Sequence, residues 1–87
     1  MDNKNLKTKQ TLTLAYENHI KNNLDLAESL YNKILKIDPN HIDSIFLLGT
    51  LYLQKKNFDK AMKLFEEVIK IKPNHAIALH NLAYALI

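Results

Sequence analysis

The side chains of this sequence that could do chemistry are four histidines and scattered carboxylates. A metal site needs three or four ligands that converge on one point. No two histidines in this chain are separated by three residues, the spacing that often places two ligands on one helical face. We expect only His19 and His80 to share a surface, whereas His41 and His75 stand at helix starts and have a structural role. We therefore predict no metal site.

The carboxylates and hydroxyls give no support for catalysis either. Glu66 and Glu67 are adjacent, so on a helix their side chains point about 100° apart. No serine or threonine has a convincing base and orienting acid, and no glycine-rich loop could hold a phosphate. Cysteine is absent, which excludes disulfides and thiolate ligands. We therefore predict that the protein is not an enzyme and needs no cofactor.

The composition favours one small helical domain. The chain has 87 residues, of which 47% are apolar, with only one glycine and two prolines to mark turns. All twelve basic residues are lysines, which argues against a nucleic-acid partner because bidentate readout of phosphate and guanine relies mostly on arginine. No apolar run approaches the roughly 18 residues of a membrane span. We expect a cytoplasmic protein with no membrane or nucleic-acid partner.

The sequence repeats itself at a shift of 34 residues. Without a gap, eleven of 34 aligned positions are identical. The identical positions in the first copy are Leu14, Lys21, Asn23, Asp25, Ala27, Leu30, Lys36, Ile37, Pro39, Asn40 and His41. Such self-similarity predicts stacked copies of one supersecondary unit.

Apolar periodicity and capping residues divide the repeats into helices. The predicted helices cover 7–21, 24–37, 41–54, 58–71 and 75–87, after a polar tail at 1–7. Asn23 and Asn57 precede the second and fourth helices, and Asn40 and Asn74 precede the third and fifth. Asparagine is a favourable N-cap residue, so we expect these four side chains to cap the helices. The fold class is all-α.

One register of residues carries a resemblance to a known family. The residues are Ile45, Leu48, Gly49, Tyr52, Ala61, Phe65 and Pro73. The pattern resembles the tetratricopeptide repeat, a 34-residue helix–turn–helix unit, with Ile45 where tryptophan is commonest. The resemblance implies antiparallel helix pairs stacked as a right-handed α-solenoid of five helices. It divides residues 8–87 into repeats at 8–41 and 42–75 and the first helix of a third at 76–87.

The resemblance also implies a function, which is protein–protein interaction. Proteins of this family line a concave groove with the first helix of each unit and bind a peptide or helix of a partner there. By register, the groove-lining residues here would be Lys9, Leu12, Thr13, Tyr16, His19, Phe46, Leu47, Thr50, Leu53, Ile77, His80, Asn81 and Tyr84. At the positions where chaperone-binding members use Lys, Arg and Asn, this chain is mostly apolar, so we do not expect a carboxylate clamp.

A second hypothesis is that the apolar surfaces serve the assembly of the protein into an oligomer or onto another domain. The last predicted helix has an apolar flank with no following helix to cover it, formed by Ala78, Leu82, Ala85 and Leu86. Terminal repeats normally need a polar outer face, so we expect a homodimer through this flank. In this alternative the chain is a structural module that docks to itself or to an attached catalytic domain, such as the glycosyltransferase or sulfotransferase domains that similar repeat regions often precede. Under the leading interpretation we expect the chain to be a fragment of a longer repeat-containing protein.

Overall fold

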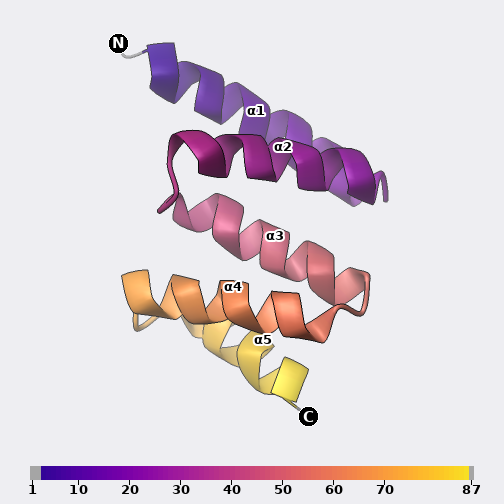
Figure 1. Ribbon diagram of the computed structural model, residues 1–87, viewed down its shortest axis with the longest axis vertical. Coiled ribbons are helices and arrows are strands. Elements are labelled where there is room, and N and C mark those ends of the chain that lie inside the picture. Colours follow the sequence, from indigo (N-terminus) through magenta and orange to yellow (C-terminus); the bar gives the residue numbers. More distant parts are fainter. Residues whose placement is uncertain (1–2, 87) are drawn as a thin grey trace.

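The structure, a computed structural model, describes the backbone of residues 3–86 and the side chains of residues 5–85. This part of the chain forms α-helices joined by short turns, as predicted. The helices are α1 (Asn3–Ile20), α2 (Leu24–Ile37), α3 (Ile42–Gln54), α4 (Phe58–Ile71) and α5 (Ala76–Leu86). Figure 1 shows them stacked in chain order, with successive helices antiparallel and the two termini at opposite ends. The prediction of an all-α fold with five helices is confirmed for the described residues.

The first helix is longer than predicted. We expected the first helix to begin at residue 7, but α1 already begins at Asn3, so the predicted start is four residues too late. This segment contains no glycine or proline, and its lysines and leucine are good helix formers. The helix therefore extends outward, and the described side chains of residues 5–7 remain exposed.

Two turns of the same conformation close the helix pairs α1–α2 and α3–α4. Asn22 has φ 67° and Lys56, 34 positions later, has φ 61°. The residue after each of them donates its backbone N–H five residues back, from Asn23 to Asn18 at 2.8 Å and from Asn57 to Tyr52 at 2.8 Å. This is the Schellman arrangement, which satisfies the last carbonyl groups of a helix. The 34-residue repeat is therefore present in the backbone of both turns.

The caps of α3 and α5 differ from the prediction. The residues that cap these helices are His41 and His75, not Asn40 and Asn74. The Nδ1 atom of His41 accepts the backbone N–H of Ser44 at 3.2 Å, and that of His75 accepts the N–H of Ala78 at 3.1 Å. A neutral imidazole has one ring nitrogen free to accept such a bond, so histidine can serve as the cap one residue after the asparagine. The structural role expected for these two histidines is therefore present in both copies.

The asparagines before α2 and α4 also behave differently from each other. Asn57 caps α4, since its side chain accepts the backbone N–H of Lys60. Asn23 makes no cap bond, and its amide donates to the side chain of Asn18 at 3.1 Å instead. The prediction of an Asn23 cap is therefore wrong, since this side chain is hydrogen bonded back to α1 and makes no bond to the first turn of α2.

The register that defines the repeat forms the core. Leu48 and Phe65 are almost fully buried, as are Tyr31 and Ala61. Gly49 leaves room on α3 for the Phe65 ring of α4, because a Cβ atom there would lie 2.7 Å from Cε1 of Phe65. In the first copy, Leu14 stands where Leu48 stands in the second but is 48% exposed, because no helix of the described chain covers that side of α1.

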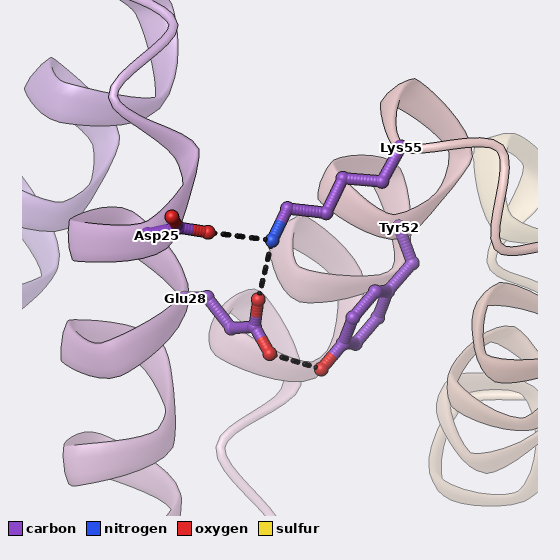
Figure 2. Close-up of polar contacts among 4 residues, drawn as sticks. All are labelled: Asp25, Glu28, Tyr52 and Lys55. Atoms are coloured by element: carbon purple, nitrogen blue, oxygen red, sulfur yellow. Dashed lines mark hydrogen bonds and ion pairs between the residues drawn. The ribbon is translucent and has the colours of Figure 1, made fainter.

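A polar cluster joins α2 to α3, and so joins the two repeats (Figure 2). Lys55 donates from Nζ to Asp25 Oδ1 at 2.9 Å and to Glu28 Oε1 at 2.8 Å. The Tyr52 hydroxyl donates to Glu28 Oε2 at 2.6 Å. The bonds from Lys55 and Tyr52 hold the pKa of Glu28 below its ordinary value. Burial, the larger cause, and the hydrogen bond to Glu28, the smaller one, raise the pKa of Tyr52 to about 12. This cluster therefore adds polar contacts between one repeat and the next.

Candidate functional site

An open hollow of about 590 Å³ lies between α1 and α3. Its lining residues are Leu12, Thr13, Tyr16, Glu17, Asp43, Phe46 and Leu47. Five of the predicted groove residues, Leu12, Thr13, Tyr16, Phe46 and Leu47, are therefore brought together from two helices that are a repeat apart in the sequence. We call this hollow the α1–α3 groove.

The apolar floor of the α1–α3 groove is held by the core beneath it. The Phe46 ring lies 6.0 Å from that of Phe65 and 5.0 Å from that of His75, centroid to centroid. Leu12 and Leu47 also pack against the buried core. Tyr16 is different, since it is 48% exposed. The groove therefore combines a floor packed on the core with one aromatic side chain, that of Tyr16, that remains accessible.

A second, more polar hollow of about 440 Å³ adjoins the first. It is lined by Asn5, Thr8, Lys9, Leu12, Asp38, His41 and Asp43. Leu12 and Asp43 line both hollows, so the two are neighbouring parts of one trough. This trough runs along α1 and over the turn between α2 and α3.

His19 is not a groove residue, so this part of the site prediction is wrong. It is only 8% exposed. Its Nδ1 atom lies 2.9 Å from the Tyr31 hydroxyl, and its Nε2 atom is hydrogen bonded to the side chain of Gln54. Burial raises the pKa of Tyr31 to about 12. The imidazole joins three helices inside the stack, because α2 and the end of α3 close over this part of α1.

Of the other predicted groove residues, Lys9 lines the second hollow and the rest line neither hollow. Thr50 and Leu53 are half-buried on α3, and the Thr50 hydroxyl donates to the backbone oxygen of Leu47 at 2.7 Å. The remaining four residues lie on α5, where Asn81 is half-buried and the others are exposed. These residues are Ile77, His80, Asn81 and Tyr84.

The flank of α5 predicted to mediate self-association is partly internal. Ala78 is fully buried, because α5 packs against α4 through this side, so Ala78 cannot contact a second chain. Leu82 packs against the same core, and Ala85 is half-buried. The side chain of Leu86 lies outside the described residues. The exposed large apolar side chains of α5 are instead Ile77, Leu79 and Tyr84.

Two groups of functional interest were missed by reasoning from the sequence. The first consists of Glu17 and Asp43, which bring carboxylates to the edges of the α1–α3 groove. The available signal was the position of Asp43 three residues before Phe46, which places both on one helical face. The second consists of Lys55 and its carboxylate partners. Lys55 and Asp25 are 30 residues apart, so no pattern of neighbouring residues in the sequence predicts that they form an ion pair.

The described residues contain no cluster of three or more His, Cys, Asp or Glu side chains that could hold a metal ion. Over the same part of the chain, none of the helices combines the length and the apolar character that crossing a membrane requires. All buried polar side-chain atoms that the structure describes have hydrogen-bond partners.

Comparison with known proteins agrees with this geometry. The family model described as "Tetratricopeptide repeat" matches residues 20–87. YrrB, whose crystal structure is described as that of a TPR protein with an unusual peptide-binding site, is similar with a TM-score of 0.80 and 30% identity. The match covers 85% of this chain and 38% of that one.

A second solved structure, that of a mutant of MamA, is similar in fold with a TM-score of 0.81 and 23% identity. That match covers 91% of this chain and 58% of MamA, so this chain spans less than two thirds of either structure. A search of curated proteins gave no significant match.

Proposed function

From the premise that this chain belongs to the tetratricopeptide repeat family, we propose that it binds a peptide segment of a partner protein in the α1–α3 groove. Modules of this family generally act as scaffolds for protein–protein interaction. The similar structure of YrrB is described as having a peptide-binding site, which supports a peptide as the ligand.

The observation that carries this proposal is the convergence of Leu12, Tyr16, Phe46 and Leu47 in one open hollow. These four side chains are apolar or aromatic, and Tyr16 is half-exposed in the unbound molecule. Exposed apolar surface that gathers in a concave place is typical of recognition sites. A hollow of about 590 Å³ lies in the range of roughly 300–1,000 Å³ usual for ligand sites. We propose that it accepts one or two bulky side chains of the peptide.

The proposal is tested by selecting peptides from a random library displayed on phage and measuring their affinity by fluorescence anisotropy. Tyr16→Ser removes the exposed aromatic ring of the groove, and we expect affinity to fall at least about tenfold, which corresponds to about 1.4 kcal/mol. Tyr84→Ser is the matched control, because Tyr84 is 63% exposed on α5 and does not line the hollow.

We expect Tyr84→Ser to bind the selected peptides as the unchanged protein does. Thermal unfolding of both variants shows whether they remain folded. If the Tyr16→Ser protein is folded and binds the selected peptides with unchanged affinity, the groove is not their site and the proposal is wrong.

A second candidate function is self-association through α5. Ile77 and Tyr84 are 60% and 63% exposed and lie seven residues apart, on one face of this short helix, and large apolar side chains that share an exposed face are typical of an interaction surface. We expect sedimentation equilibrium to show a dimer that Ile77→Lys dissociates. Leu26→Lys is the control, since Leu26 is 50% exposed on α2. A protein that stays monomeric at high concentration would contradict this candidate.

A further inference from the structure

We infer that the α1–α3 groove selects a cationic peptide, in which a bulky apolar residue has lysine or arginine close to it in sequence. This inference rests on the proposed function and specifies the chemistry of the ligand. The apolar residue would occupy the floor between Tyr16 and Leu47, and the cation would meet the carboxylates of Glu17 and Asp43.

The first observation is the sign of the charges along the trough. Its two hollows are lined by three carboxylates, those of Glu17, Asp38 and Asp43, and by a single ammonium group, that of Lys9. The protein as a whole carries a net charge of +3. The charge of the trough is therefore opposite in sign to the net charge of the molecule. The affinity for a charged ligand depends on this local field more than on the net charge.

The second observation is that no basic side chain of the described residues pairs with the groove carboxylates. Among the described residues, neither Glu17 nor Asp43 forms an ion pair, and both side chains are exposed. The carboxylates of the cluster between α2 and α3 differ, since Lys55 contacts both Asp25 and Glu28. The negative charge at the groove is thus still available to a ligand.

The third observation is the place of these carboxylates relative to the apolar floor. Glu17 follows Tyr16 directly on α1, and Asp43 lies three residues before Phe46 on α3, about one helical turn away. Both line the same hollow as the floor residues. A ligand whose apolar side chain enters the floor therefore presents its neighbouring residues to these two carboxylates. An acidic neighbour would be repelled there.

The size of the effect follows from the exposure of the pair. Ion pairs at exposed sites are weak and are screened by salt. We expect the two carboxylates together to change affinity by about three- to tenfold. The apolar contact supplies most of the affinity. The two carboxylates determine which of the peptides that form this apolar contact bind most tightly.

The test uses synthetic peptides of about nine residues with a central phenylalanine. Three versions carry lysine, serine or glutamate two positions before and two positions after the phenylalanine, and a fourth carries lysines around a central alanine. We expect the lysine–phenylalanine peptide to bind most tightly and the glutamate peptide least, by fluorescence anisotropy at low salt. The preference should shrink as salt is added.

Charge-removing variants assign the preference to the groove. The double variant Glu17→Gln, Asp43→Asn should lose the preference for lysine over serine while its affinity for the serine peptide stays the same. The control Glu66→Gln, Glu67→Gln removes the same charge from exposed positions of α4 that do not line the trough. This control should keep the lysine preference.

The outcomes separate this inference from the function on which it rests. If the phenylalanine peptides bind through Tyr16 but the glutamate version binds as tightly as the lysine version, the inference fails and the groove remains a peptide site. If the α4 control abolishes the lysine preference as fully as the groove variant does, the attraction is nonspecific and the inference fails. If no phenylalanine peptide binds better than the alanine peptide, both the inference and the proposed function fail.

Discussion

Replacing Gly49 by alanine sets two effects of known size against each other. Alanine is favoured over glycine in the interior of a helix by about 1 kcal/mol, so by propensity alone Gly49→Ala would stabilise the protein. The structure opposes this, because the new Cβ would lie 2.7 Å from Cε1 and 3.0 Å from Cζ of Phe65.

The Phe65 ring cannot yield freely to relieve this contact. An ordinary contact begins near 3.4 Å, so the ring or the helix must move by about 0.7 Å. Phe65 has no exposed surface, and its ring also lies against that of Phe46. Overpacking of this kind costs about 1–3 kcal/mol. With the helix-propensity gain subtracted, we expect Gly49→Ala to destabilise the protein by up to about 2 kcal/mol.

The assay is urea unfolding followed by circular dichroism, applied to a double-mutant cycle with Phe65→Leu. In the Phe65→Leu background the ring atoms are gone, so Gly49→Ala should become neutral or stabilising. A coupling free energy of about 1 kcal/mol or more between the two positions is the expected result. Ala83→Gly serves as the control, because Ala83 holds the equivalent position on α5 and is exposed there. If Gly49→Ala alone stabilises the protein by the full propensity gain, the close contact between Gly49 and the Phe65 ring is wrong.

Three further predictions concern stability. The hydrogen bonds to Glu28 lower its pKa below 4.5. Their contribution to the free energy of unfolding should therefore be complete above pH 4.5 and be lost as the pH falls through the lowered pKa. Glu28→Gln should make the urea midpoint less dependent on pH in the acid range. The raised pKa values of Tyr31 and Tyr52, from 10.0 to about 12, predict stability that is complete below pH 10 and lost between pH 10 and pH 12, and Tyr52→Phe should reduce that loss in alkaline unfolding curves. His41→Ala removes the cap of α3 and leaves the hydroxyl of the buried Ser44 without its partner, so we expect a loss of about 0.5–2 kcal/mol in thermal unfolding, whereas a change under about 0.5 kcal/mol would contradict the cap.

The main elements of the fold follow from the sequence. The shift of 34 residues predicted two copies of one helix pair, and the equivalent left-handed residues Asn22 and Lys56 show that the backbone repeats at this interval. Leu48 and Phe65 were expected in the core and are buried. These features are predictable because periodicity on a helix and the conformation of a tight turn depend on residues that are close in sequence.

The candidate site was predicted only in part. Leu12, Tyr16, Phe46 and Leu47 share a face of their helices, and a face can be assigned from helical spacing alone. His19 and Ala78 were assigned to accessible faces by the same helical spacing, but both are buried. Whether a given face position is covered depends on how the neighbouring helix crosses it, and the spacing within one helix does not contain that crossing.

The sequence by itself determined the helices, their turns and the apolar register that makes them stack. Only the tertiary structure decided which polar groups meet: His19 with Tyr31 and Gln54, and the Glu17 and Asp43 carboxylates at one groove. The physical reason is the range of the interactions. A helix is specified by contacts three and four residues apart, whereas a charge or a hydrogen bond between repeats depends on the distance and angle between two helices, which the packing of the whole stack sets.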